Sequence, residues 1–185
     1  MRQENAAIPG VVNRAAGTDM INGQTVLAII PCRSGSKRVP GKNFRPFRGR
    51  PLYEWTLEQA RLSRYIDTLY VSRDEDRPAE LCTDTATSED VMRHHQAAHP
   101  HHWIVLLQPT SPLRTAEDID ACIERAQLGQ GCISVAFSTG KTNGAIYVCT
   151  AEYLAAHDFT YGALMKYVMP DDRSLDIDEE HQFHA

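Results

Sequence analysis

The feature that most limits the possible folds of this chain is a series of short apolar segments separated by polar loops and amphipathic stretches. The segments VLAII (26–30) and WIVLL (103–107) are apolar throughout, which is typical of strands buried on both faces of a parallel sheet. Further strands are expected at 68–72, 132–137 and 144–148.

Helices are expected between these strands, at 51–65, from Thr87 onward, at 115–127 and at 151–157. Two of them begin at capping-box spacing, Thr87 with Asp90 and Thr115 with Asp118. Alternating strands and helices predict an α/β fold, a doubly wound and mostly parallel sheet with helices on both faces in a Rossmann-like three-layer arrangement.

Length and charge narrow the class of protein. A chain of 185 residues that is 42% hydrophobic suits one well-buried domain. We therefore expect a flexible N-terminal extension over 1–24 and a single domain over 25–185. The net charge of −5 argues against a nucleic-acid binder. No apolar run reaches membrane-span length, and the five cysteines contain no CxxC pair. We expect reduced thiols in a cytoplasmic protein that binds neither nucleic acid nor membrane.

The loop PCRSGSKRVPGKN (31–43) follows the first predicted strand and is rich in cations. It fails the phosphate-binding P-loop pattern, because five residues separate Gly35 from Gly41 and Asn43 replaces the hydroxyl residue. Main-chain amides around Gly35 can still approach an anion, and Arg33, Lys37 and Lys42 supply positive charge. The sequence favours a phosphate-binding loop, with a basic surface turn as the alternative.

An acidic counterpart lies near the C-terminus, in SLDIDEE (174–180). On an extended segment Asp176 and Asp178 face the same side. Two carboxylates on one face suit Mg²⁺, which also binds water and phosphate oxygens. The alternative is a solvated acidic terminus.

Other polar segments indicate a functional site less specifically. QPTSPLR (108–114) follows a predicted strand and suits hydrogen bonding to a polyhydroxylated substrate, or is a turn before a helix. Asn143-Gly144 has the composition of a hairpin turn. HHQAAHPHH (94–102) matches no zinc-ligand spacing, and no GxGxxG sequence follows a strand.

Five segments occur in an order that resembles one enzyme family: IIPCRSGSKRVPGKN, RPAELCTDTA, LLQPTSPLR, NGAIYV and SLDID. This order is similar to that of the acylneuraminate cytidylyltransferases, and the resemblance covers most of 26–183. It implies a nucleotide-diphospho-sugar transferase-like fold. It also implies transfer of CMP from CTP to a nine-carbon keto sugar acid, with release of pyrophosphate and with Mg²⁺, or alternatively Mn²⁺, as cofactor.

The resemblance also implies residue roles. Nucleotide binding would involve Arg33, Gly35, Ser36, Lys37, Lys42, Asn43, Arg77 and Ser88. The sugar acid would contact Gln108, Thr110, Asn143, Tyr147 and Phe183. Asp176 and Asp178 would bind the metal ion, and Arg33, Lys42 and Asp178 would be the catalytic residues.

This chain departs from the family pattern in two places. Little separates YVSRDE from DRPAEL, and only STGKT separates CISVAF from NGAIYV, where the family carries an extension that reaches across a dimer. The shortening puts the family's homodimer in doubt. It leaves a non-catalytic nucleotide- or sugar-binding remnant as the alternative to an enzyme. The sugar acid stays open among the sialic, legionaminic and pseudaminic types.

Overall fold

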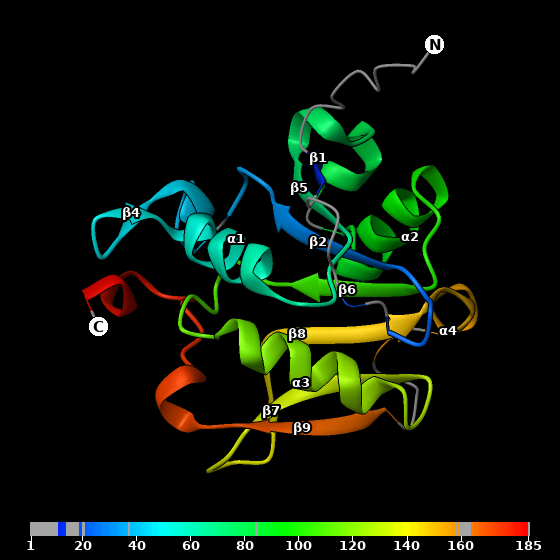
Figure 1. The fold of residues 1–185 in the computed structure, drawn as a ribbon. Helices are drawn as coiled ribbons and strands as arrows, with labels where there is room; N and C mark the ends of the chain where they lie inside the picture. Colours follow the sequence, from blue (N-terminus) through cyan, green and yellow to red (C-terminus); the bar gives the residue numbers. More distant parts are fainter. Residues whose placement is uncertain are drawn as a thin grey trace.

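The structure, a computed structural model, describes residues 11–13, 19, 21–36, 38–83, 85–157, 159 and 164–184. Its centre is a seven-stranded sheet in the order β1-β5-β2-β6-β8-β7-β9 (Figure 1). The strands are β1 (Val11–Asn13), β2 (Val26–Cys32), β5 (Thr68–Arg73), β6 (Trp103–Leu107), β7 (Gly131–Ala136), β8 (Thr142–Thr150) and β9 (Met165–Met169). A separate two-stranded sheet consists of β3 (Pro46–Phe47) and β4 (Arg50–Pro51).

The sheet is mostly parallel, as predicted, in the sense that all of its strands except β1 and β8 run in the same direction. β2 pairs in parallel with β5 and with β6, and β7 pairs in parallel with β9. β8 runs antiparallel to both of its neighbours, β6 and β7. Its direction follows from the sequence, because the five residues between β7 and β8 can close a hairpin but cannot carry a crossover to a parallel strand.

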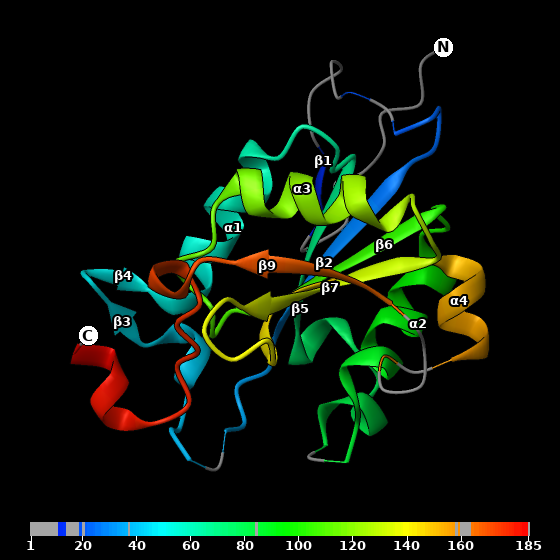
Figure 2. The same cartoon turned by 90° about the horizontal axis from the view of Figure 1, so that it is seen from below.

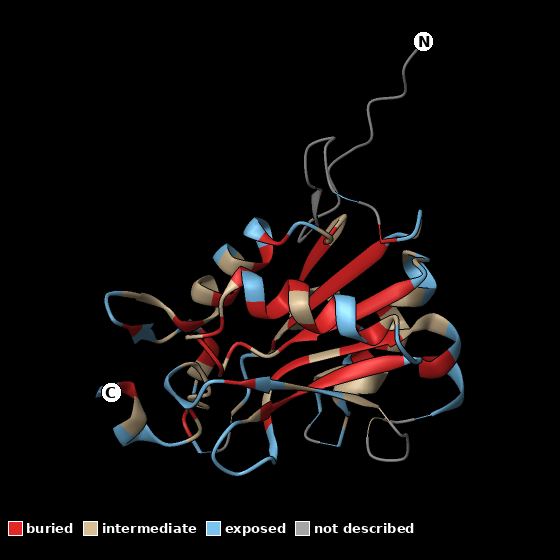
Figure 3. Ribbon diagram, turned by 60° about the horizontal axis from the view of Figure 1, so that its bottom comes forward, coloured by how far each residue is buried: buried red, intermediate tan, exposed pale blue. Residues whose placement is uncertain are grey.

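Helices cover both faces of the sheet. They are α1 (Leu52–Leu62), α2 (Ser88–Ala98), α3 (Ala116–Ala126) and α4 (Ala151–Ala156). Alternate residues of β2 serve opposite faces, because Val26 and Ala28 pack with residues of α1 and α3, whereas Leu27 and Ile29 pack with residues of α2 and α4. The three layers are visible in Figure 2, and the buried central strands in Figure 3.

The two predicted capping boxes are present. The Thr87 hydroxyl accepts a hydrogen bond from Asp90 N at 3.1 Å, while Thr87 N donates to Asp90 Oδ2 at 3.0 Å. Thr115 and Asp118 make the same reciprocal pair at the start of α3. These contacts satisfy amides that have no partner within the helix, which explains why both helices begin where the sequence predicts.

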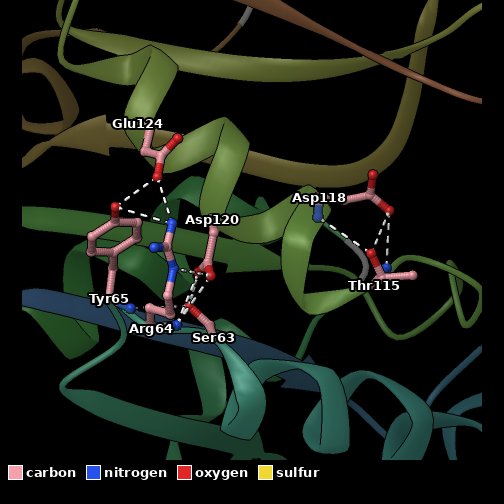
Figure 4. Close-up of polar contacts among 7 residues, drawn as sticks. All are labelled: Ser63, Arg64, Tyr65, Thr115, Asp118, Asp120 and Glu124. Atoms are coloured by element: carbon pink, nitrogen blue, oxygen red, sulfur yellow. Dashed lines mark hydrogen bonds and ion pairs between the residues drawn. The ribbon is translucent and has the colours of Figure 1, made fainter. Parts of the chain in front are cut away.

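Polar contacts also fix α3 against the end of α1 (Figure 4). The buried carboxylate of Asp120 accepts hydrogen bonds from Ser63 Oγ at 2.6 Å and from Arg64 N at 3.1 Å. One turn further along α3, Glu124 accepts from Arg64 Nη2 at 2.8 Å and from the Tyr65 hydroxyl at 2.6 Å. The two helices are therefore held together by charge as well as by apolar packing.

Several elements were not predicted from the sequence. β9 and the β3–β4 pair are short and show no strong apolar alternation. Within the segment assigned to an N-terminal extension, Val11–Asn13 pairs antiparallel with β5, and Ile21 is buried. The other residues of that segment up to 20, apart from Asp19, lie outside the described residues.

The five cysteines are free thiols, and all except the half-buried Cys82 are buried. None of the helices in the described ranges combines the length and the apolar character that a membrane span requires.

The central strands should contribute most to stability. Ile104 on β6 is fully buried, so Ile104→Ala should lower the free energy of unfolding by about 2–5 kcal/mol through lost burial and a cavity. Leu128→Ala, at a site that is 74% exposed, should change it by no more than about 0.5 kcal/mol. Urea denaturation of both variants measures the difference, and equal effects would contradict this assignment of the core.

Candidate functional site

Three loops that leave the carboxyl ends of neighbouring strands meet around one cavity. They are the basic loop (33–43) after β2, the segment 74–87 after β5, and the QPTSPLR loop (108–114) after β6. Because β5, β2 and β6 are adjacent and parallel, their carboxyl ends lie at the same edge of the sheet, where ligands bind in open α/β folds. The cavity has a volume of about 490 Å³.

Most residues predicted to bind the nucleotide line this cavity. Those on its wall are Arg33, Ser36, Lys42, Asn43, Arg77 and Ser88, together with Gln108 and Thr110 from the predicted sugar side. Gly35 lies exposed on the basic loop and is not part of the lining. Lys37 lies outside the described residues.

The basic loop is held in place by hydrogen bonds at both of its ends. The buried Asn43 donates from Nδ2 to the Arg33 carbonyl oxygen at 3.0 Å, which closes the loop on itself. Ser34 N donates to Asp74 Oδ2 at 2.8 Å. Gly41 has a φ of 64°, a left-handed conformation that favours glycine. The loop is therefore preorganised to present its cations to the cavity.

Arg77 forms part of the opposite wall. Its side chain is 2% exposed and pairs with Asp74 Oδ1 at 2.6 Å. Nε donates to the Arg73 carbonyl oxygen at 3.1 Å, and Nη1 donates to the Leu81 carbonyl oxygen at 3.4 Å. Three of its donors are thus bonded within the protein, and Arg77 fixes the shape of this wall at the same time as it adds positive charge.

Asp178 joins the C-terminal segment to the basic loop. Its Oδ1 accepts from Lys42 Nζ at 2.8 Å, and its Oδ2 lies 3.3 Å from Arg38 Nη1. Partial burial would raise the pKa of the Asp178 carboxyl, but the hydrogen bond and charge of Lys42, with the charge of Arg38, hold this pKa below its ordinary value. Asp178 is therefore ionised at neutral pH.

Asp176 lies next to Asp178 in a more buried environment. Its Oδ1 is buried and has no hydrogen-bond partner among the described residues. Burial first, and then the neighbouring charge of Asp178, raise the pKa of the Asp176 carboxyl, against a hydrogen bond with Thr110. A side chain at Gly144 would bring its Cβ within 3.4 Å of Asp176 Oδ2 and 3.5 Å of Gln108 Oε1, so glycine keeps the space beside this carboxylate open.

These two carboxylates fit a divalent cation. An unpartnered buried oxygen beside a second, ionised carboxylate is a typical part of a Mg²⁺ or Mn²⁺ site. Across the described ranges, no group of three or more His, Cys, Asp or Glu side chains is placed to hold a metal ion. Water and substrate oxygens would therefore have to complete the coordination of an ion bound here.

The segment that carries this pair is fixed from several directions. Ile177 N donates to the Thr110 carbonyl oxygen at 2.8 Å, which ties the segment to the QPTSPLR loop. Gln182 accepts from Asp178 N at 2.6 Å and donates to the Asp176 carbonyl oxygen at 2.9 Å. Both carboxylates therefore stay beside the wall of the cavity although they are remote from it in sequence.

The other residues predicted to face the sugar do not line the cavity. Asn143 is buried and bonded internally, because its Oδ1 accepts from Ser134 Oγ at 2.6 Å and its Nδ2 donates to Ser174 Oγ at 3.0 Å. The Tyr147 ring packs on Phe159, with the ring centroids 5.0 Å apart. Phe183 belongs to a separate apolar cluster.

Asn143 also corrects the expected position of a turn. Asn143-Gly144 lies within β8 and not in the hairpin turn, which is formed by 137–141. The register between β7 and β8 shifts at this point, and Gly144 has a φ of 73°. The irregular part of β8 lies beside the Asp176 carboxylate, and bulges are common next to functional sites.

Several residues that shape the site were not predicted from the sequence. Lining residues without a predicted role include Pro31, Arg38, Leu81, Thr83, Ala86, Thr87, Val91 and Pro109. The clearest sequence signal among them was Arg38, because it belongs to the run of cations in the basic loop. The apolar members gave no signal, since a wall residue and a core residue look alike in sequence.

Arg114, at the end of the QPTSPLR loop, is 1% exposed. It donates hydrogen bonds to the carbonyl oxygens of Gln108 and Ala145 and to the hydroxyl of Thr56. Burial lowers the pKa of Arg114 to about 9, and the charge of Asp118 acts against this shift. Arg114 is therefore still charged at neutral pH, and it links the QPTSPLR loop to the irregular part of β8.

His95 lies behind the cavity on α2. It is 2% exposed, its Nε2 lies 2.7 Å from Ser72 Oγ, and its ring packs on Tyr70. Burial, assisted by the positive charges of His94 and Arg77, lowers the pKa of His95 from 6.5 to about 4. The imidazole is therefore neutral at pH 7 and serves as a buried hydrogen-bonding partner.

Comparison with known proteins agrees with the motif order. A family model described as cytidylyltransferase matches residues 27–84. The chain is 27% identical to the N-acylneuraminate cytidylyltransferase of Escherichia coli O18:K1:H7, over 85% of this chain and 50% of that protein. It is 29% identical to the CMP-N,N'-diacetyllegionaminic acid synthase of Legionella pneumophila, over 83% of this chain and 90% of that protein.

The two relatives differ in length. The chain spans about half of the Escherichia coli protein but most of the Legionella protein. The alignment with the latter runs over 210 positions, more than the 185 residues of this chain. The alignment therefore contains gaps in this chain, and the family resemblance predicts such gaps at the two shortened intervals.

A solved structure supports the fold. The CMP-2-keto-3-deoxy-manno-octonic acid synthetase in complex with CTP superimposes with a TM-score of 0.68 at 11% sequence identity, over 86% of this chain and 95% of that one. The predicted nucleotidyltransferase-like fold is thus confirmed, and so is the resemblance to the cytidylyltransferases.

The neutral His95 makes stability depend on pH. Between pH 6.5 and pH 4 the unfolded chain binds a proton at this residue that the folded protein does not bind. The free energy of unfolding should therefore fall as the pH is lowered through this range, by up to roughly 3 kcal/mol from this residue alone.

His95→Gln should remove that part of the pH dependence, since an amide can bond to Ser72 but does not titrate. His102→Gln, at an exposed position, is the matched control and should keep the wild-type slope. Urea denaturation between pH 4 and pH 7 measures all three proteins. The same slope in His95→Gln and wild type would show that His95 is not the titrating group.

Proposed function

We propose that this chain is a CTP-dependent cytidylyltransferase, because its sequence is similar to those of N-acylneuraminate cytidylyltransferases and its fold is similar to that of the CMP-2-keto-3-deoxy-manno-octonic acid synthetase. It transfers CMP from CTP to a nine-carbon keto sugar acid of the sialic, legionaminic or pseudaminic type and releases pyrophosphate. The observation that carries this proposal is the junction of Lys42 and Arg38 with the Asp176–Asp178 pair beside a cavity of about 490 Å³.

The charges around the cavity suit a bound triphosphate. Arg33, Arg38 and Lys42 lie on the side formed by the basic loop, and Arg77 lies on the opposite wall. Fixed cations of this kind stabilise charge that develops on phosphate oxygens during transfer, and a preorganised loop does so with little reorganisation. The polar wall around Ser88 and Thr87 would contact the base and the ribose of the bound nucleotide.

The reaction is a substitution at the α-phosphorus of CTP. The anomeric hydroxyl oxygen of the sugar forms the new bond to this phosphorus and gives up its proton to a base, for which Asp178 is the candidate. The bond to the bridging oxygen of the β-phosphate breaks, and pyrophosphate leaves with the electron pair. A divalent cation bound by Asp176 and Asp178 would supply Lewis-acid polarisation of the phosphate. Lys42 and Arg33 stabilise the charge on the leaving pyrophosphate.

In this arrangement Asp178 has a second role besides its pairing with Lys42 and Arg38. Its carboxylate is ionised and is paired with Lys42 and Arg38. A bound triphosphate attracts the same two cations, which releases Asp178 Oδ1 from its ion pair. The released carboxylate is then available to a metal ion or to the proton of the attacking hydroxyl.

One observation favours a second candidate function. Asn143 and Phe183, two of the residues expected to contact the sugar, are occupied in internal packing and do not line the cavity. A non-catalytic nucleotide-binding relative, in which the sugar subsite is reduced, is therefore the alternative. The two functions differ in one measurable property, which is turnover of CTP in the presence of a sugar acid.

The first test is pyrophosphate release from CTP and Mg²⁺ with a panel of nine-carbon keto sugar acids. Asp178→Asn should lower this rate on the order of 10²–10³-fold, because an ionised carboxylate beside the reacting phosphate is lost. CTP binding in the presence of EDTA should not weaken in this variant, since Lys42 and Arg38 are released from their ion pair.

Asp172→Asn, at an exposed position on the same C-terminal segment, is the control and should keep the wild-type rate. CTP binding by the wild type without pyrophosphate release for any sugar acid would reject the transferase and favour the non-catalytic alternative. Activity of Asp178→Asn at the wild-type level would reject the role assigned to this carboxylate.

Lys42 provides an independent test of the phosphate subsite. Lys42→Met keeps much of the side-chain volume but removes a charged hydrogen bond to phosphate, so the CTP dissociation constant should rise about 10- to 100-fold. Lys166→Met, on the exposed side of β9, should leave it unchanged. Isothermal titration calorimetry with CTP measures both, and equal affinities in all three proteins would place the phosphates elsewhere.

A further inference from the structure

The segment that carries the proposed metal ligands has no regular secondary structure of its own. Residues 174–178, the SLDID segment, belong to no helix or strand. A helix or a strand sets the positions of its side chains through a repeating hydrogen-bond ladder, and this segment lacks one. The positions of Asp176 and Asp178 must therefore come from the contacts at its ends and along its length.

The strongest polar contact at its N-terminal end is made by Arg173. The guanidinium donates from Nε to Asp118 Oδ2 at 2.9 Å and from Nη2 to Asp118 Oδ1 at 2.8 Å. This two-pronged geometry fixes the direction of the side chain as well as its distance. The Asp118 side chain is fully buried, and that of Arg173 is 32% exposed. Solvent therefore screens this pair less than a surface ion pair.

Asp118 is itself held rigidly. Thr115 donates to its Oδ2 from the main-chain nitrogen at 3.0 Å and from the hydroxyl at 3.2 Å. The Tyr167 hydroxyl donates to Oδ1 at 2.9 Å. With the two bonds from Arg173, five donors surround this carboxylate. The carboxylate that completes the capping box of α3 is thus also the contact point for the C-terminal segment.

The Arg173–Asp118 ion pair matters for the site because of where Asp118 lies in the chain. Asp118 lies in the first turn of α3, directly after the QPTSPLR loop that lines the cavity. Arg173 directly precedes the SLDID segment. We propose that Arg173 is a positioning residue, which through Asp118 sets the SLDID segment against the QPTSPLR loop and so places the Asp176–Asp178 pair for metal binding.

Two further contacts show that the same two segments meet along their length. Ile177 N bonds to the Thr110 carbonyl oxygen, and Asp176 lies beside Gln108 at Gly144. These contacts involve the SLDID segment itself, whereas Arg173 fixes the point at which the chain enters it. A loss at that point should shift both carboxylates together relative to the cavity. Arg173 touches neither of them, and it is therefore no metal ligand.

The inference rests on the proposed function for its metal, but its test does not require turnover. Mn²⁺ is the probe, and its binding in the presence of CTP is followed by electron paramagnetic resonance. Arg173→Gln should raise the Mn²⁺ dissociation constant on the order of 10–100-fold, as the loss of groups that orient metal ligands does. Arg173→Lys keeps the charge without the fork, and it should restore part of the affinity.

The same helix offers a matched control. Arg64 lies just after the end of α1 and pairs with Asp120 and Glu124, two other carboxylates of α3 (Figure 4). Arg64→Gln removes both of these ion pairs from the same helix and leaves the SLDID segment unaltered. It should leave Mn²⁺ affinity at the wild-type level, and thermal unfolding of each variant reports the general loss of stability.

The results distinguish a positioning role of Arg173 from a general effect on the stability of the protein. Weaker Mn²⁺ binding in Arg173→Gln than in Arg64→Gln, at a comparable melting temperature and with partial rescue in Arg173→Lys, supports the inference. Unchanged Mn²⁺ affinity in Arg173→Gln overturns it, as does an equal loss in Arg64→Gln. If Arg173→Gln does not fold, Arg173→Lys decides alone, and wild-type affinity in a folded Arg173→Lys protein with a broken fork overturns the inference.

The inference and the proposed function can fail separately. Arg173-dependent Mn²⁺ binding in a protein that releases no pyrophosphate with any sugar acid would reject the transferase and keep the inference. Normal turnover with a Mg²⁺ requirement that is the same in wild type and Arg173→Gln would keep the transferase and reject the inference.

Discussion

The Lys42–Asp178 ion pair is the interaction on which the site depends. It joins residues that are 136 positions apart in the chain, at a distance of 2.8 Å. Without it, the cations of the basic loop would repel one another, and so would the carboxylates of the C-terminal segment. With it, the proposed phosphate-binding loop and the proposed metal-binding pair come together at one rim, and Lys42 helps to hold the pKa of Asp178 below its ordinary value.

The sheet makes this meeting possible. Adjacent parallel strands place the loops after β5, β2 and β6 at one edge, and the buried strands give that edge a rigid base. The C-terminal segment reaches the same edge by a different route, after β9 at the far side of the sheet. The contacts that hold it there are the ion pair of Arg173 with Asp118, the hydrogen bond of Ile177 with Thr110 and the two hydrogen bonds of the Gln182 side chain.

Much of the fold was predictable, because local patterns agree with tertiary packing. The apolar runs at 26–30 and 103–107 became buried strands, and two capping boxes marked helix starts. The basic loop was predictable as a loop, because glycine and proline residues interrupt the apolar pattern directly after a buried strand. β9 was not, because its exposed Lys166 and Val168 break the pattern of a buried strand.

The sequence by itself determined the class of the fold, the basic loop and the identity of the carboxylate pair, because each depends on residue type and on near neighbours. Only the tertiary structure decided which of these residues face the cavity. Asn143 and Phe183 have chemistry suited to a sugar site, but long-range contacts place one beside Ser134 and the other in an apolar cluster. Asp118 has the sequence signature of a helix cap, and its second role appears only when Arg173, 55 positions away, folds onto it. Residue type sets what a side chain can do, whereas packing sets which partner it finds.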